Sequence, residues 1–222
     1  MGNVNEFKNI RIFFSKKGDA KYISHLDLTR CMQRCIKRSG IPIWYTQGFH
    51  PHQYMTFALP LALGYESECE SMDIRLTEPM DFQELKERLN DALPRDIRVH
   101  KVADQQMDPK EISFADYEIQ VAFSCDDVLT KFEKLMAMER INVEKRTKKG
   151  IKEVDLKPLV QVISTGEEND QLLLKLRLPA GNTLNINPTL LFEAFCKVYH
   201  CEVEAYHILR TGIFTGNLAE FC

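Results

Sequence analysis

The apolar positions of residues 1–103 form a regular series of strands and helices. Apolar side chains recur at helical spacing between Leu28 and Ile36, and again between Phe82 and Ala92, which predicts two helices that each bury one face. Short apolar or alternating runs around them predict extended segments. These runs are residues 11–14, 41–45, 54–63, 67–76 and 97–102. The series predicts the order β-α-β-β-α-β, the split motif of a ferredoxin-like domain.

Capping residues mark the ends of both predicted helices. Asp27 is the expected N-cap of the first helix. Asp81 is the expected N-cap of the second, and Glu84 completes a capping box three residues later. Gly40 is expected to end the first helix, because Pro42 cannot continue it.

The second half of the chain repeats this order of elements without repeating its residues. Ser124 or Asp126 is expected to open one helix, and the Asn187-Pro188 pair to open another. The expected extended segments are residues 117–123, 143–145, 154–164, 171–178 and 201–209. We therefore predict an α+β protein of two tandem ferredoxin-like domains. Residues 1–103 and 114–222 are the expected domains, and the polar stretch 104–113 is the expected linker.

Composition narrows the class of protein. The 222 residues are 44% hydrophobic and 27% charged, as in an ordinary globular chain. No apolar run approaches the roughly 20 residues of a membrane-spanning helix. Since the N-terminus also lacks the features of a signal peptide, we expect a cytoplasmic protein without a membrane partner.

The sequence contains no motif that identifies a metal, a cofactor or a common enzyme class. Its seven cysteines lack C-x-x-C spacing, which favours reduced thiols over a zinc or iron–sulfur site. The G-x-G-x-x-G, P-loop, H-E-x-x-H and G-x-S-x-G patterns are all missing. We therefore expect no bound metal and no cofactor.

The segment KYISHLDLTR at residues 21–30 contains the first candidate chemistry. His25 titrates near neutral pH, so it could act as a general acid or base on a phosphate at the start of the helix. In this Ser24-His25-x-Asp27 cluster, the nearby carboxylate could orient the imidazole of His25 or raise its pKa. The alternative is that Ser24 and Asp27 only cap the helix, while His25 packs where the chain enters it.

The segment YTQGFHPHQ at residues 45–53 contains the second group of candidate functional residues. Gly48 permits a turn or a close approach to a ligand, and Pro51 restricts His50 to extended geometry. His50 and His52 could hold a phosphate, or share a metal with His25. An exposed rigid turn with solvated imidazoles is the alternative.

Lys and Arg outnumber Asp and Glu in residues 1–50, and they cluster on the first predicted helix. The cationic side chains that share one helical face are Arg30, Arg34, Lys37 and Arg38. With Lys21 and the aromatic residues Tyr45 and Phe49, they have the mixture of charge and stacking surface that suits single-stranded RNA. A solvated helix face would have the same pattern.

A second basic run occupies residues 144–153. Its candidate contacts are Lys145, Arg146, Lys148 and Lys149. They could form the tip of a hairpin that touches nucleic acid, or a merely solvated loop. For the N-terminal candidates we expect the helix start and the His-Pro-His loop to converge on one polar rim beside the basic helix face.

The run from Lys21 to Leu76, with its SHLDL and GFHPH segments, and the later TKKGIKEVDLKPLV resemble the radical SAM-linked proteins, a bacterial family of unknown function. Members of that family stand alone or are fused behind a radical SAM protein. Their genes often lie near those of ribonuclease G-type enzymes and ribosomal proteins. This chain has no radical SAM cysteine triad, so the resemblance implies a separate accessory polypeptide with a radical SAM partner in an RNA setting.

The predicted architecture is also similar to that of the CRISPR repeat-processing RNA endonucleases, which cleave RNA without metal. That resemblance implies His25 as general base, with Lys21 or Arg30 stabilising charge on the phosphate. Those enzymes carry a glycine-rich loop near the C-terminus, to which residues 210–216 are only a faint counterpart. Three hypotheses follow: an RNA-associated accessory protein, an RNA endonuclease, or a protein-docking module.

Overall fold

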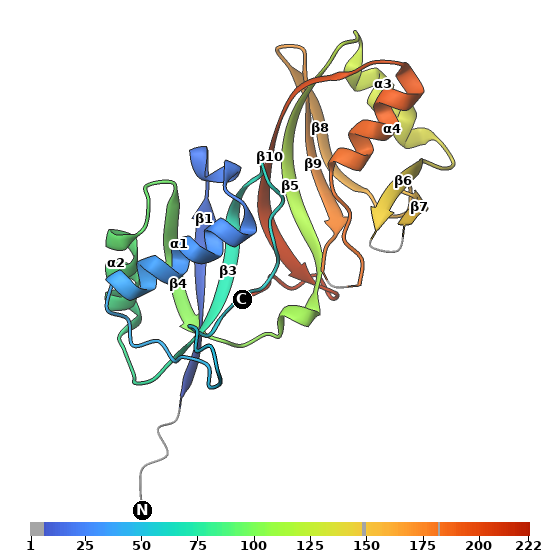
Figure 1. Cartoon of the computed structure of the whole chain (residues 1–222). Coiled ribbons are helices and arrows are strands. Elements are labelled where there is room, and N and C mark those ends of the chain that lie inside the picture. Colours follow the sequence, from blue (N-terminus) through green and yellow to red (C-terminus); the bar gives the residue numbers. More distant parts are fainter. Residues whose placement is uncertain (1–6, 148–149, 182) are drawn as a thin grey trace, which may run out of the picture. The chain divides into compact units, whose positions relative to one another are not determined.

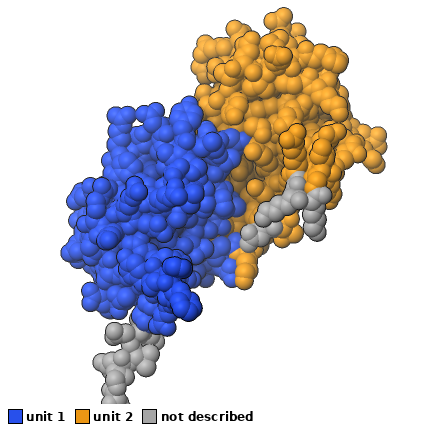
Figure 2. Space-filling view, in the orientation of Figure 1, with its two compact units in different colours: residues 1–109, 222 blue, residues 110–221 orange. Residues whose placement is uncertain are grey.

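The computed structural model describes residues 7–147, 150–181 and 183–222. The chain forms two compact units, and Figure 2 shows them in different colours. Unit 1 contains the residues up to Pro109 together with Cys222, and unit 2 contains Lys110–Phe221. Strands and four α-helices make up the described part of the chain, so the fold class is α+β.

Unit 1 is an antiparallel sheet with two helices (Figure 1). Its elements are β1 (Lys8–Lys16), η1 (Gly18–Tyr22), α1 (His25–Arg38), β2 (Met55–Phe57), β3 (Glu66–Leu76), α2 (Phe82–Ala92) and β4 (Ile97–Asp104). The strands are ordered β4-β1-β3, and β2 pairs with β3. Every one of these pairings is antiparallel.

The core of unit 1 lies where alternate residues of the sheet meet the apolar stripes of the helices. Ile10, Ile12 and Phe14 of β1 belong to the same buried cluster as side chains of α1 and α2. The helix members are Leu28, Met32, Cys35, Ile36, Leu85 and Leu89. Full burial of each large aliphatic side chain contributes about 1.5–3 kcal/mol, so this cluster fixes the position of α1 against the sheet.

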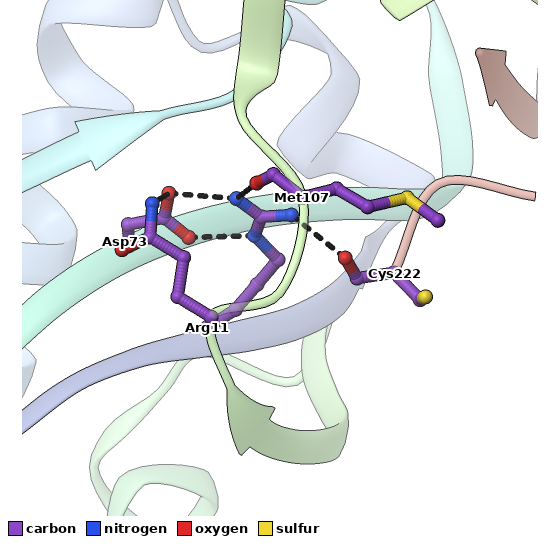
Figure 3. A network of polar contacts seen from close by, with 5 residues as sticks. Arg11, Asp73, Met107 and Cys222 are labelled. Atoms are coloured by element: carbon purple, nitrogen blue, oxygen red, sulfur yellow. Dashed lines mark hydrogen bonds and ion pairs between the residues drawn. The ribbon is translucent and has the colours of Figure 1, made fainter. Parts of the chain in front are cut away.

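The residues of β1 and β3 that point away from this core include a buried ion pair (Figure 3). Arg11 Nε lies 2.6 Å from Asp73 Oδ1, and a terminal nitrogen of Arg11 lies 2.9 Å from Asp73 Oδ2. The guanidinium also donates to the carbonyls of Met107 at 2.8 Å and Cys222 at 2.9 Å. Gln105 Nε2 donates to the Asp73 carboxylate at 3.0 Å. These partners replace the water that both charges lose on burial.

Unit 2 is also an antiparallel sheet with two α-helices. Its elements are β5 (Ile112–Phe123), α3 (Val128–Ala137), β6 (Asn142–Thr147), β7 (Gly150–Asp155), β8 (Gln161–Glu168), β9 (Gln171–Pro179), α4 (Thr189–Tyr199) and β10 (Val203–Thr215). A short 3-10 turn, η2 (Pro109–Glu111), precedes β5. The strands are ordered β10-β5-β9-β8, and β6 and β7 form a separate hairpin.

An aromatic cluster joins the sheet of unit 2 to α4. The ring of Phe123, at the end of β5, lies 4.2 Å from that of Phe195 and 6.1 Å from that of Phe192. Phe195 in turn contacts Tyr199, whose hydroxyl donates to Lys131 O at 2.8 Å on α3. The two helices of unit 2 are therefore connected to each other as well as to the sheet.

Two predictions about the entry to α1 and the segment after it are wrong. The N-cap is Ser24, whose side chain accepts a hydrogen bond from the Asp27 backbone, so Asp27 lies inside the helix. Residues 41–45 are not a strand, because Ile43 and Tyr45 form only isolated bridges. The Pro42 nitrogen has no hydrogen to donate, which leaves this segment unable to form a continuous ladder. The strand that follows α1 is β2.

The start of α3 also differs from the prediction. This helix begins at Val128, after neither Ser124 nor Asp126. Ser124 instead pairs with Glu202: its backbone nitrogen donates to Glu202 O, and its hydroxyl accepts from Glu202 N, both at 2.9 Å. Asp127 is the N-cap residue, with a left-handed backbone at φ 55° and no side-chain cap.

Candidate functional site

The polar residues at the start of α1 are mostly engaged in capping. The Ser24 hydroxyl accepts from Asp27 N at 3.1 Å and donates to Asp27 Oδ2 at 2.7 Å. The other carboxylate oxygen accepts from Arg30 at 3.3 Å. The exposed ring of His25 packs edge-on against Phe57, with ring centres 5.0 Å apart. Asp27 is therefore committed to Ser24 and Arg30, and the packing contact of His25 is with an aromatic ring.

Lys21 lies in η1, just before the start of α1. Its ammonium group is 3.6 Å from Glu66 Oε1 and lies 5.3 Å above the ring of Tyr22. The Lys21 side chain is 23% exposed and that of Glu66 is 15% exposed. The nearby carboxylate therefore offsets much of the positive charge that Lys21 could offer to a phosphate.

The arginines of α1 form the clearest ligand-sized feature of unit 1. Arg30, Arg34 and Arg38 follow one another at four-residue intervals, about 6 Å apart along the helix axis. They line a groove of about 610 Å³ whose other wall is the end of α2 and the residues after it, 92–94. We call these three side chains the arginine row. Lys37 is exposed on the same helix but does not line the groove.

The three arginines of the row are not equally available. Arg38 donates to Ala92 O at the C-terminal end of α2, and Cys35 Sγ also contacts this carbonyl at 3.1 Å. A cation at the negative end of a helix stabilises it, so Arg38 has a structural role. Arg30 pairs with Asp27. Within the ranges that the structure describes, no hydrogen bond or ion pair engages the guanidinium of Arg34.

A cysteine pair lines the floor of the same groove. Burial raises the pKa of the Cys31 thiol to about 11, and the adjacent Cys35 adds to the rise, although Arg38 and Arg34 oppose it. Cys31 is therefore a neutral thiol at physiological pH rather than a nucleophilic thiolate. The groove can hold an anion, but its Cys31 thiol is not prepared for covalent chemistry.

The loop at residues 46–52 forms the tip of a tight hairpin. Its backbone is closed by the Tyr45–Gln53 bridge and by Thr46 N donating to His52 O at 2.8 Å. His52 Nδ1 lies 3.0 Å from the Thr46 hydroxyl and 3.2 Å from His50 O, so this imidazole supports the turn. Gly48 adopts a φ of 136°, a value that side chains rarely permit. His50 and Phe49 are exposed at the tip.

The structure places Lys21, just before α1, and the start of this loop near opposite ends of β3, and the polar rim stays a prediction. Lys21 O accepts from Gly64 N, beside the first residue of β3, whereas Trp44 N donates to Arg75 O near its last residue. β3 has 11 residues and separates the two places by roughly 30 Å. Figure 1 shows η1 and the segment after α1 at opposite ends of the unit 1 sheet. His25 lies between these two places, because its ring packs on Phe57, which pairs with Met72 of β3.

Arg75 lies beside the base of this loop and was not predicted from the sequence. The Arg75 guanidinium lies 4.9 Å from the ring centre of Trp44 and 4.6 Å from that of Tyr54. Arg75 also donates to Asn9 Oδ1 at 2.9 Å. Trp44 and Tyr54 flank the predicted loop in the sequence, but no spacing rule connects them to an arginine that lies 21 residues after Tyr54 and 31 after Trp44.

The second basic run lies on the β6–β7 hairpin of unit 2. Lys145 is opposite Lys152, and its ammonium group donates to Asn185 O at 2.5 Å. Arg146 is exposed opposite Ile151. The remaining candidates, Lys148 and Lys149, lie outside the described residues. One of the two described candidates, Lys145, is thus already used within the unit.

All seven cysteines are free. The fold nevertheless brings Cys125 close to Cys196 and Cys201, which lie far from it in the sequence. Burial and the hydrogen bond with Cys125 raise the pKa of Cys201 to about 12, so this thiol stays protonated. Among the residues that the structure describes, no group of His, Cys, Asp and Glu side chains has the geometry to hold a metal ion.

The described helices include none that is both long and apolar enough to cross a membrane. No curated protein matches the sequence. Among solved structures, one titled as an unknown protein from Galdieria sulphuraria aligns with 92% of this chain and 99% of that chain, at 10% identity and a TM-score of 0.27. The family described as "Uncharacterized protein conserved in bacteria (DUF2344)" matches residues 9–188. Because this match covers most of the sequence, the chain belongs to that bacterial family.

Proposed function

We propose that this protein is an RNA-binding accessory protein and that the arginine row of α1 holds phosphate groups of the RNA. The observation that carries the proposal is the groove of about 610 Å³ in which Arg34 presents its guanidinium beside Arg30 and Arg38. Arginine suits this task because its planar fork can donate two parallel hydrogen bonds to one phosphate. Arg34 is the main contact, since Arg38 is also bound to α2 and Arg30 to Asp27.

A protein partner is the second part of the proposal. The resemblance to the radical SAM-linked proteins supports a radical SAM protein as that partner. Because this chain lacks the cysteine triad that would hold the cluster, the partner would supply the chemistry. The accessory chain would then contribute recognition of the RNA.

For the fold we propose two tandem ferredoxin-like domains. The support is the common strand order of the units, β4-β1-β3 with β2 on β3, and β10-β5-β9-β8. In each unit the first strand lies between the last and the third, as the split β-α-β motif requires. The β6–β7 hairpin is then an insertion between the first helix and the second strand of unit 2.

The contacts of His25 favour binding over cleavage at the start of α1. A general base needs a partner that orients its ring or tunes its pKa. Asp27, the nearest candidate in sequence, is bonded to Ser24 and Arg30, while Lys21 faces Glu66. The endonuclease hypothesis therefore gains no specific support from the geometry, and we keep the accessory role as the proposal.

The test measures the binding of a fluorescent single-stranded RNA of mixed sequence by anisotropy over a range of salt concentrations. We expect Arg34→Gln to weaken binding about tenfold, because a charge-assisted contact to phosphate is lost. The slope of log affinity against log salt should fall by about one, which is the signature of one lost phosphate contact.

The matched control is Lys134→Gln, which removes an exposed cation from α3, the corresponding helix of unit 2. This control should bind RNA as the unaltered chain does. If the unaltered chain fails to bind RNA at low salt, the proposed function is wrong and the protein-docking hypothesis replaces it. If both variants lose the same affinity, the contact is general surface charge and not the arginine row.

A further inference from the structure

The hairpin formed by residues 44–54, which we call the presenting hairpin, is held rigidly at its base. Tyr54 N donates to Trp44 O at 3.0 Å, and the Tyr45–Gln53 bridge follows. Nearer the tip, His52 N donates to the Thr46 hydroxyl at 3.1 Å. Backbone and side-chain bonds thus fix the geometry of the turn before any ligand arrives.

The base of the presenting hairpin is also fastened to β3. The Arg75 guanidinium lies over the rings of both Trp44 and Tyr54, whose centres are 5.8 Å apart. Its backbone carbonyl accepts from Trp44 N at 2.7 Å. Cation–π contacts and this hydrogen bond hold the stem against the sheet, so the hairpin tip cannot collapse onto the core.

Phe49 stands at the tip with its side chain fully exposed, at 101%. Leaving a large aromatic ring in water forgoes the favourable free energy of burying it. Because the hairpin that carries Phe49 is already rigid, less conformational entropy is lost when the ring binds. Aromatic anchor residues of interfaces act in this way. The exposure of Phe49 and the rigidity of its hairpin therefore favour a role in which a ligand covers the ring.

The charge around the tip restricts the kind of contact. The sequence has no Lys or Arg between Arg38 and Arg75, and no Asp or Glu between Asp27 and Glu66. The residues of the presenting hairpin therefore carry no fixed charge of their own. Stacking on a base requires no charge, because every base has a π-face that an aromatic ring can cover.

We propose that Phe49 stacks on an unpaired base of the RNA that the arginine row holds, so that the ligand is RNA with an unstacked nucleotide rather than a continuous duplex. This inference rests on the proposed function. Bases inside a duplex are already stacked on their neighbours, whereas bases in loops, bulges and single strands can rotate onto an aromatic side chain. Residues 39–43 connect Arg38, at the end of the row, to the hairpin.

The test uses two RNA duplexes. Their base-paired sequence is the same, and one of them also contains a single unpaired 2-aminopurine as a bulge. The unaltered chain should bind the bulged duplex more tightly and quench the 2-aminopurine fluorescence. Phe49→Ala should lose about tenfold in affinity for the bulged duplex and lose the quenching. Its salt dependence should stay unchanged, because no phosphate contact is removed. Phe49→Trp should retain both binding and quenching.

Tyr22→Ala is the matched control, since Tyr22 is an aromatic residue of unit 1 that is 66% exposed and lies outside the hairpin. It should preserve the preference and the quenching. If Phe49→Ala keeps both while RNA binding persists, the stacking proposal is overturned and the proposed function stands; a protein pocket would then be the ligand of the ring. If the unaltered chain binds neither duplex nor single-stranded RNA at low salt, the proposed function fails as well.

Discussion

The two units carry the same ion pair with its charges exchanged. In unit 1, Arg11 lies on the first strand and Asp73 on the third, directly opposite in the register. In unit 2, Asp116 lies on the first strand and Arg177 on the third, again directly opposite. Arg Nε lies 2.6 Å from a carboxylate oxygen in both pairs. The units thus share a structural position without sharing the residue that occupies it.

The two pairs differ in what covers them. Arg11 and Asp73 are 0% and 7% exposed, and the backbones of Met107 and Cys222 complete the coordination of the guanidinium. The side chains of the second pair, Asp116 and Arg177, remain 18% and 17% exposed, and the ring of Phe214 lies 4.2 Å from that guanidinium. Water can therefore reach the partly exposed pair of unit 2 when it is broken, but not the buried pair of unit 1. Because the two pairs have the same Nε–carboxylate distance, we expect any difference in their effect on stability to come from burial.

The largest effect is expected from breaking the buried pair. Asp73→Ala should lower the free energy of unfolding by about 3–5 kcal/mol, because it leaves the Arg11 charge buried without its carboxylate. Asp116→Ala, the matched change in unit 2, should cost only about 1–2 kcal/mol, since water can solvate Arg177. Denaturant unfolding followed by the fluorescence of Trp44, the single tryptophan, reports on unit 1, and circular dichroism reports on both.

Equal costs for the two aspartate variants would show that burial does not separate the pairs. A further control replaces both partners in unit 1, as Arg11→Met with Asp73→Leu. This double variant should recover much of the stability lost in Asp73→Ala, because no uncompensated charge is left inside.

A smaller effect is expected at the starts of the two corresponding helices, α1 and α3. Ser24→Ala should destabilise unit 1 by about 1 kcal/mol, because the Asp27 backbone nitrogen loses its side-chain acceptor. Asp127→Gly, which keeps the left-handed backbone accessible, should give no comparable loss from capping, since the Asp127 side chain makes no cap hydrogen bond. Thermal unfolding of both variants measures the difference. A larger loss in Asp127→Gly would contradict this assignment of the caps.

The smallest effect concerns pH and is confined to unit 1. Burial lowers the pKa of His100, on β4, below its ordinary value of 6.5, and Lys101 lowers it further, while the bond to Glu68 O opposes the shift. The unfolded chain therefore takes up a proton at a higher pH than the folded chain. Stability should fall as the pH drops through 6.5 toward the folded pKa. In His100→Gln, the midpoint of unfolding should vary less between pH 7.5 and 5.5; an identical pH profile would exclude His100 as the cause.

The helices were the most predictable part of the fold. Leu28, Met32, Cys35 and Ile36 recur at the helical period, and all four are buried in the core of unit 1. Such periodicity depends only on residues within a few positions of one another, so it can be recognised from the sequence alone. Residues 41–45 were mistaken for a strand because their apolar character is also local, whereas strand pairing depends on a distant partner. In the structure Ile43 is buried through a single bridge to Leu76.

The candidate site was predictable in its parts but not in its arrangement. The cationic stripe Arg30, Arg34 and Arg38 is visible from four-residue spacing alone. The second wall of its groove comes from residues 92–94, and the stacking of Arg75 on Trp44 comes from across the sheet. Neither this groove wall nor the Arg75–Trp44 contact can be recognised in the sequence, because each joins residues that only packing brings together.

By itself, the sequence determined which segments become helices, which helix face carries positive charge and which loop is rigid, since these depend on neighbours within a few residues. The tertiary structure decided which of these features meet. The length of β3 places Lys21 and the presenting hairpin near opposite ends of one sheet, and the contact with α2 turns a charged helix face into a groove. Long-range register and packing govern both outcomes, so the pattern along the chain could suggest the chemical groups but not the site that they form.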